Sequence, residues 1–198
     1  MTAKLSVIGL LVIIMFAQGC TTFKATQPAI TKTENSRVIN KDFESTWNAT
    51  MAFVADTFYI IDNIVKDSKI ITLSFSSSNP SSFVDCGNLV SSKSSKSVPI
   101  ASKSYRAGIC DYSSRLSGKI NIIMTSLSDD KTKVKVNTRY VVDWKQQCPG
   151  SYNIPIVQTR NFAFSTNGSS SNGNITCTSN SRIEDGILDG IESMASKQ

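Results

Sequence analysis

A stripe of large apolar residues near residues 43–58 predicts an amphipathic helix. Its members recur every three or four residues, which places them on one face of a helix with 3.6 residues per turn. The stripe consists of Phe43, Trp47, Met51, Val54 and Phe58. Asn40 or Asp42 can cap the start, because both side chains accept hydrogen bonds from free backbone amides. The other faces are polar, so we expect this helix to cover one side of a sheet.

Alternation of apolar and polar positions predicts the strands of that sheet. The shorter expected strands are residues 36–39, 58–65, 69–76 and 154–164. Pro155 favours an edge position for the last of them. The strongest pattern pairs residues 120–124 with residues 134–142 as an antiparallel hairpin, because alternate residues in both segments are mostly apolar.

A second helix is expected at the C-terminus. Ser181 and Glu184 have the spacing of a capping box, in which each side chain accepts a hydrogen bond from the backbone amide of the other. Ile183, Ile187, Ile191 and Met194 then follow on one stripe. Gly186 and Gly190 lie one turn apart on a neighbouring line, which indicates either close approach of another element or a frayed helix.

Two polar segments separate these elements. Residues 76–104 are rich in serine and lysine and are expected to form a long exposed loop. Residues 165–174 are expected to form a flexible loop tip. The order of the elements predicts an α+β fold. We expect one antiparallel sheet of about five to six strands, with an N-terminal and a C-terminal amphipathic helix packed on one face.

The pattern of the first 20 residues predicts an export signal. Residues 5–17 form an uncharged apolar run between Lys4 and the pair Gly19–Cys20. The run is too short to span a bilayer, which requires about 20 residues. A basic start, a short apolar run and a small residue at the end are typical of a secretory signal peptide, so we expect residues 1–19 to be removed. A buried helix would not explain Lys4 or the small residue.

The segment around Gly19–Cys20 resembles the lipobox of bacterial lipoproteins. The resemblance implies that Cys20 is diacylated and that its acyl chains anchor the protein to a membrane. Thr21, where retained lipoproteins have Asp, is similar to lipoproteins sorted to the outer membrane, where we expect the protein to face the periplasm. Residues 20–35 lack periodicity and are expected to be a lipidated tether. Residues 36–198 would then form a single domain.

Charge and composition argue against two classes of partner. The formal net charge is +6, but the basic residues are dispersed. Nucleic-acid binding requires a concentrated basic patch, so we expect no nucleic-acid partner. The chain has no histidine, and its cysteines lack the spacing of zinc sites. We therefore expect neither a metal site nor a cofactor.

The cysteines indicate two disulfides. With Cys20 carrying lipid, four cysteines remain in an exported chain: Cys86, Cys110, Cys148 and Cys177. Around the polar turn of the predicted hairpin, the residue numbers of cross-strand partners add up to about 258, which Cys110 and Cys148 satisfy. This register selects Cys110–Cys148 from the three possible pairings, and Cys86–Cys177 follows by elimination.

Several short segments resemble periplasmic lipoproteins. The chain resembles a helix-grip-like arrangement, as found in the C subunit of the outer-membrane barrel-assembly machine, at residues 42–47, 58–61 and 66–71. Residues 83–87, and residues 177–179 with Glu184, are similar to segments of poorly characterised outer-membrane lipoproteins. The expected single domain and two disulfides distinguish this chain from the barrel-assembly subunit.

Three functions are compatible with these patterns. We expect a non-catalytic envelope protein that binds or scaffolds an envelope protein or polymer, because catalytic motifs are missing. The alternative is a carrier of a lipid or small apolar ligand, in a cavity between helix and sheet lined by Phe43, Trp47, Phe58, Tyr59 and Phe75. An enzyme without histidine would need Ser–Lys, cysteine or paired-carboxylate chemistry. Its best nucleophile, Cys86, is better explained by a disulfide.

Overall fold

The computed structural model describes residues 23–30, 32–92 and 96–197. This part of the chain is mostly β, with 53% of the described residues in strands and 20% in α- or 3-10 helices. The main sheet contains β2 (Ser36–Ile39), β3 (Ile60–Val65), β4 (Ile70–Ser77), β8 (Ser104–Ala107), β9 (Cys110–Ser128), β10 (Lys131–Cys148) and β11 (Ile156–Ser165). One small sheet contains β1 (Phe23–Ala25), β6 (Asn88–Ser91) and β7 (Ser97–Pro99), and another β5 (Val84–Asp85), β12 (Ser169–Asn172) and β13 (Ile175–Ser179). The helices are α2 (Phe43–Ala55) and α3 (Arg182–Ser196), with short 3-10 turns η2 (Pro80–Ser82) and η3 (Ser151–Asn153).

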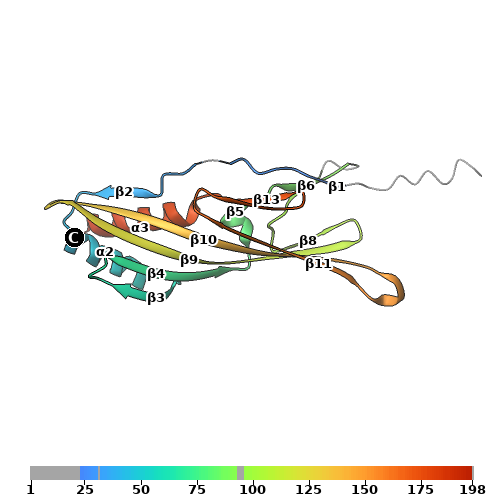
Figure 1. The fold of residues 1–198 in the computed structure, drawn as a ribbon, viewed down its shortest axis with the longest axis horizontal. Coiled ribbons are helices and arrows are strands. Elements are labelled where there is room, and N and C mark those ends of the chain that lie inside the picture. Colours follow the sequence, from blue (N-terminus) through green and yellow to red (C-terminus); the bar gives the residue numbers. More distant parts are fainter. Residues whose placement is uncertain (1–22, 31, 93–95, 198) are drawn as a thin grey trace, which may run out of the picture.

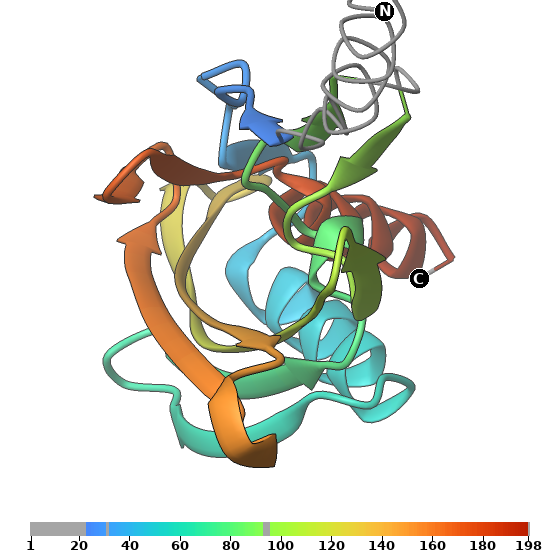
Figure 2. The same ribbon diagram turned by 90° about the vertical axis from the view of Figure 1, so that its right-hand side faces the viewer.

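The long hairpin of β9 and β10 runs along the long axis of the molecule (Figure 1). Across the main sheet the order is β11-β10-β9-β4-β3, with β2 also paired to β10 and β8 to β9. The sheet curves around α2, which lies on its concave side (Figure 2). We call the end that holds the helices and the β9–β10 turn the helical end. The opposite end, formed by the β8–β9 turn and the β10–β11 loop, is the tip end (Figure 1).

The expected fold class is wrong. The described chain has thirteen strands in three sheets, the largest of seven strands, rather than one sheet of five to six strands with two packed helices. Most of the difference lies in segments without apolar alternation. Residues 76–104, expected to be a loop, contain β5, β6, β7 and η2. These strands have only two to four residues each and are held by backbone pairing, so they are too short to leave a hydrophobic period in the sequence.

The first helix begins as expected but ends earlier. Asp42 caps α2, because its carboxylate accepts a hydrogen bond of 2.9 Å from the backbone N–H of Ser45. The helix ends at Ala55, so Phe58 is not part of its buried stripe and is fully exposed. Trp47 and Val54 do lie in the core.

The second helix lacks the expected capping box. Ser181 has a left-handed backbone (φ 67°) and makes no side-chain cap. Its hydroxyl instead donates to the hydroxyl of Thr33. Glu184 turns into the core and is fully buried. The spacing of Ser181 and Glu184 therefore serves tertiary contacts rather than a local cap.

The two glycines of α3 differ in their surroundings, and this leads to a paired prediction. A Cβ atom at Gly190 would lie 2.1 Å from Cε2 of Phe53 on α2, whereas one at Gly186 would meet no atom within 4 Å. We expect Gly190→Ala to lower the free energy of unfolding by about 1–2 kcal/mol, since the Phe53 ring must move. Gly186→Ala should raise it by up to about 1 kcal/mol through helix propensity. Urea unfolding measured by circular dichroism tests the pair, and equal effects would contradict the contact between the helices.

Both expected disulfide bonds are present. The structure pairs Cys86 with Cys177 and Cys110 with Cys148. Between β9 and β10 the partners add up to 258 from Thr132–Ser126 to Gln147–Asp111. Next to the turn, Lys131 pairs with Ser128, and a register shift between Lys131 and Thr132 gives the expected sum for the rest of the hairpin. The Cys86–Cys177 disulfide lies in the core, and the Cys110–Cys148 disulfide joins β9 to β10 at the tip end.

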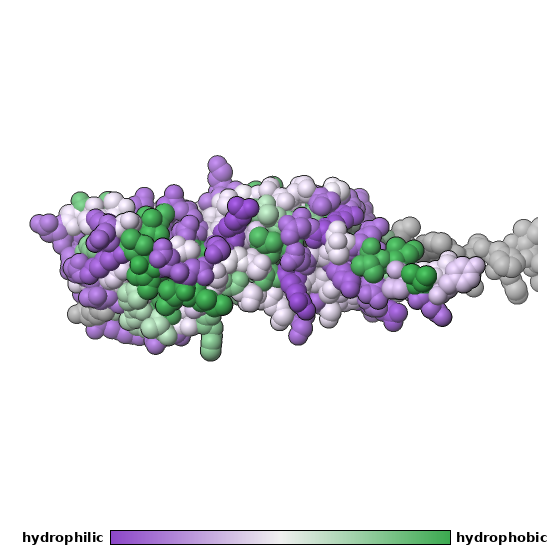
Figure 3. All heavy atoms as spheres, turned by 60° about the horizontal axis from the view of Figure 1, so that its bottom comes forward, coloured by the Kyte–Doolittle hydropathy of each residue, from purple (hydrophilic) through white to green (hydrophobic). Residues whose placement is uncertain are grey.

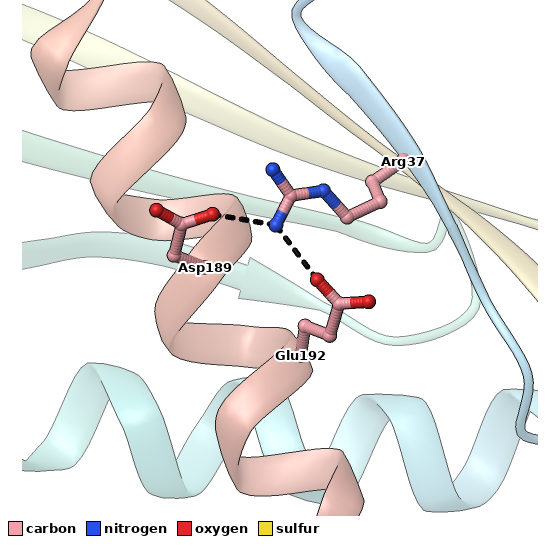
Figure 4. A network of polar contacts seen from close by, with 3 residues as sticks. All are labelled: Arg37, Asp189 and Glu192. Atoms are coloured by element: carbon pink, nitrogen blue, oxygen red, sulfur yellow. Dashed lines mark hydrogen bonds and ion pairs between the residues drawn. The ribbon is translucent and has the colours of Figure 1, made fainter.

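Part of the expected tether lies on the folded body. β1 pairs with β6, and the backbone N–H of Thr33 donates to Asn167. Directly after the expected tether, β2 is held to α3 by ion pairs. Arg37 Nη1 lies 2.6 Å from Asp189 and 2.8 Å from Glu192 (Figure 4). The expected signal peptide, residues 1–19, and the lipidated Cys20 lie outside the described residues.

Candidate functional site

The outermost strand of the main sheet exposes an unusual number of apolar side chains. All six residues of β3 are exposed. We call the exposed apolar residues of β3 and the turn before it the β3 surface: Phe58 (106% exposed), Ile60 (65%), Ile61 (46%), Ile64 (39%) and Val65 (37%). Contiguous exposed apolar surface on a soluble protein commonly marks a binding site.

A bulge decides how this surface is divided between the two faces of the sheet. Ile61 lies opposite Leu73 and Ile64 opposite Ile71, so both isoleucines are on the face that carries the core. Both nevertheless remain exposed, whereas Leu73 and Ile71 beside them are fully buried. The register shifts at Asp62, which adds one residue to β3.

Asp62 fixes the bulge from the opposite face. Its carboxylate accepts hydrogen bonds from Ser74 Oγ at 2.5 Å and from Lys119 Nζ at 3.0 Å. These bonds, first that from Ser74 and then that from Lys119, lower the pKa of Asp62 below its ordinary value. The strand is therefore held in one register although its outer edge is open. In the described chain, β4 is the only strand paired with β3.

A cavity of about 480 Å³ continues the β3 surface. It lies where the end of α2, the start of β3, the end of β4 and the first turns of α3 meet. Its apolar lining is Phe53, Phe58, Tyr59, Ile60, Phe75, Phe83 and Ile183. Figure 3 shows the apolar surface over β3 near the helical end, and a second apolar area at the tip end.

The structure brings together only some of the aromatic residues expected for a ligand cavity. Phe58, Tyr59 and Phe75 line it, whereas Phe43 and Trp47 do not. Trp47 is buried in the core, and Phe43 packs beside it with ring centroids 5.8 Å apart. The cavity thus opens beside the end of the helix rather than between its stripe and the sheet.

A buried polar network lies behind the cavity. Tyr140 donates a hydrogen bond of 2.7 Å to Glu184 Oε2, and Thr166 donates one of 2.7 Å to Oε1. Ser179 Oγ donates to the Tyr140 hydroxyl at 3.0 Å. Tyr140 and Glu184 are both fully buried. The arrangement anchors α3 to β10.

Buried tyrosines predict loss of stability at high pH. Burial raises the pKa of Tyr105 to about 12, and burial together with the charge of Glu184 raises that of Tyr140 further. Burial also raises the pKa of Tyr59 and Tyr112. A raised folded-state pKa contributes stability that is complete below the unfolded value of about 10 and is lost as pH rises through the folded values.

We therefore expect the free energy of unfolding to be level from pH 7 to 9 and to fall steeply above pH 10. Urea titrations at each pH measure it, and Tyr140→Phe should make the fall shallower than in the parent protein. A free energy that stays constant up to pH 11 would contradict this cause.

Cys86 is the nucleophile expected for the enzyme alternative. The Cys86 sulfur is bonded to Cys177, and Asp85 accepts a hydrogen bond of 2.7 Å from the backbone N–H of Gly87. In the described part of the chain, no three Cys, Asp or Glu side chains are grouped so that they can hold a metal ion.

Neither helix of the described residues is long and apolar enough to cross a membrane.

The comparisons with known proteins leave the family open. The chain matches no protein-family model, and no curated protein or solved structure is significantly similar to it. The site must therefore be interpreted from its own geometry.

Sequence reasoning predicted the strand but missed the site. The segment Ile-Ile-Asp-Asn-Ile-Val is apolar on both faces, a pattern typical of a strand buried inside a sheet. In the structure it is an edge strand. One feature of the sequence could have indicated an edge position. The segment comes directly after the first helix, in a short hairpin whose turn runs from Lys66 to Lys69.

Proposed function

We propose that the protein is a non-catalytic, lipid-anchored envelope protein that binds a partner protein through the β3 surface. In this proposal Cys20 carries the lipid, the anchor lies in the outer membrane and the body faces the periplasm. The partner contributes an extended segment that pairs with the free edge of β3.

The single observation that supports this proposal is an exposed edge strand that is apolar on both faces. Natural proteins usually protect such edges with charges, proline or covering elements. β3 has one bulge, but Ile61 and Ile64 remain exposed beside its open edge. An added strand would pair with the backbone of β3, and its alternate side chains would cover these isoleucines.

Site-specific photocrosslinking in cells tests the proposal. A photoreactive residue at Ile64 should give a defined adduct with one envelope protein. The matched control is Leu127, which is 54% exposed in the β9–β10 hairpin and should give no such adduct. Adding Ile61→Lys to the Ile64 variant should reduce the adduct by about tenfold, because a charge on the core face blocks docking.

Other adducts would contradict the proposal. Equal labelling from positions 64 and 127 would show that the contact is not specific to β3. Adducts only between copies of this chain would replace the partner by a second copy.

The cavity favours a second candidate, a carrier of a lipid or small apolar ligand. Its volume of about 480 Å³ lies within the range of small-molecule sites. Native mass spectrometry of protein extracted from membranes should then detect a bound ligand. Phe75→Trp should reduce its occupancy by filling the cavity. Absence of any bound mass would remove this candidate and leave the binding proposal intact.

A further inference from the structure

The tip end exposes a second group of large apolar residues. They lie in the β8–β9 turn, the β10–β11 loop and the start of β11: Ile109 (67% exposed), Tyr152 (96%), Ile154 (69%), Ile156 (58%) and Val157 (46%). This group lies toward the opposite end of the molecule from the β3 surface (Figure 3). Neither the β3 surface nor the cavity uses it.

The loop that carries these residues is held tightly. The disulfide between Cys110 and Cys148 joins the β8–β9 turn to the β10–β11 loop. Cys148 also pairs with Ile156 across the base of the loop. At Gly150 a Cβ atom would lie 2.1 Å from the carbonyl oxygen of Ile154, so the loop closes too tightly for a side chain there. The backbone of this loop is therefore restricted before anything binds, which lowers the entropic cost of binding.

The described chain begins at this same end. Phe23 of β1 contacts the β8–β9 turn, where a Cβ atom at Gly108 would lie 3.2 Å from Phe23 Cε2. β1 lies toward the tip end in Figure 1. Cys20 precedes Phe23 by three residues, and three residues span at most about 10 Å. Covalent geometry thus keeps the attachment point of the lipid close to the tip end.

The charges of this end also suit a lipid surface. Three basic residues and one acidic residue lie on the strand segments nearest the tip end: Lys24 on β1, Arg106 on β8, Lys145 near the end of β10, and Asp111 at the start of β9. Arg106 and Asp111 form an ion pair of 3.5 Å, which leaves Lys24 and Lys145 as net positive charge. Basic residues beside exposed apolar side chains favour anionic lipid headgroups.

We propose that the tip end docks on the bilayer that carries the Cys20 lipid, with Tyr152, Ile154 and Ile156 inserted among the headgroups and upper acyl chains. This inference rests on the lipid anchor of the proposed function. A bilayer is favoured over a protein partner because Cys20 lies at most about 10 Å along the chain from Phe23, which contacts the β8–β9 turn of this end. Docking would orient the molecule so that the helical end and the β3 surface point away from the membrane.

Tryptophan quenching in vesicles tests this docking. The mature lipidated protein is incorporated into phosphatidylcholine and phosphatidylglycerol vesicles with or without brominated acyl chains, which quench tryptophan on contact. Ile154 is replaced by tryptophan, because its backbone is extended (φ −91°, ψ 115°) and tolerates the change. Leu127→Trp at the helical end is the matched control. Trp47 and Trp144 are buried and provide a constant background.

We expect brominated lipid to reduce the added emission of Ile154→Trp to about half, and that of Leu127→Trp not at all. Adding Ile156→Asp and Tyr152→Asp to Ile154→Trp should abolish the quenching. Equal quenching in the Ile154→Trp and Leu127→Trp proteins would overturn the docking.

Vesicle flotation and intact-mass measurement separate this inference from the proposed function. A floating, lipidated protein without quenching at position 154 overturns only the docking. A protein with no lipid on Cys20 overturns both the docking and the anchor of the proposed function.

Discussion

Replacing both Cys86 and Cys177 by serine is expected to remove about 4–6 kcal/mol from the free energy of unfolding. The disulfide closes a loop with a sequence separation of 91, and the chain-entropy model assigns about 4.5 kcal/mol to a loop of this length. Both cysteines are buried in the core, so each serine also places a hydroxyl in apolar surroundings. Urea unfolding followed by tryptophan fluorescence measures the loss.

The second disulfide provides the matched control. Cys110–Cys148 closes a shorter loop, with a separation of 38, for which the same model gives about 4 kcal/mol. Its cysteines are partly exposed, so serines there remain hydrated. We expect the Cys110→Ser/Cys148→Ser protein to lose less stability than the Cys86→Ser/Cys177→Ser protein. The reverse order would contradict the contribution of burial.

A loss of this size is large against the whole stability of a domain. Most single domains are stable by about 5–15 kcal/mol. The Cys86–Cys177 disulfide links β13 to the turn between β5 and β6, and the backbone pairing of β13 with β5 covers only Thr178–Asp85 and Ser179–Val84 in the described chain. We therefore expect the small sheet of β5, β12 and β13 to lose its order first when this bond is removed.

The sequence predicted those elements whose hydrophobic period is set by the core. The register of β9 and β10 followed from alternation along both arms, and it placed Cys110 beside Cys148. Both helices also lie where their stripes indicate, although α2 ends before Phe58. Pairing in the small sheets could not be predicted, because strands such as Asn88–Ser91 are held by backbone hydrogen bonds that any residue except proline can make.

The candidate site was hidden for a different reason. Whether an apolar strand is central or at an edge depends on the order of strands, which local sequence does not encode. Ile61 and Ile64 would be ordinary core residues if another strand followed β3 in the sheet. Glu184 shows the same dependence on tertiary structure, since its spacing from Ser181 predicts a helix cap while its carboxylate contacts Tyr140.

Removing the buried carboxylate is the second substitution expected to have a large effect. Glu184→Leu should lower the free energy of unfolding by about 3–5 kcal/mol, because the Tyr140 hydroxyl loses its acceptor inside the core. Glu184→Gln should cost only about 1–2 kcal/mol, since its amide keeps one acceptor and can donate to Thr166. Thr166 can then donate to the carbonyl oxygen of Thr138, 3.3 Å away.

A double-mutant cycle tests whether the loss comes from the unpaired hydroxyl. Tyr140→Phe alone should cost about 2–3 kcal/mol, because it leaves Glu184 short of one donor. The Tyr140→Phe/Glu184→Leu protein has neither group, so it should recover about 1–3 kcal/mol relative to the sum of the single losses. Urea unfolding of the four proteins at pH 7 gives the coupling. Strictly additive losses would show that Tyr140 and Glu184 stabilise the junction of α3 and β10 by packing alone, without the hydrogen bond between them.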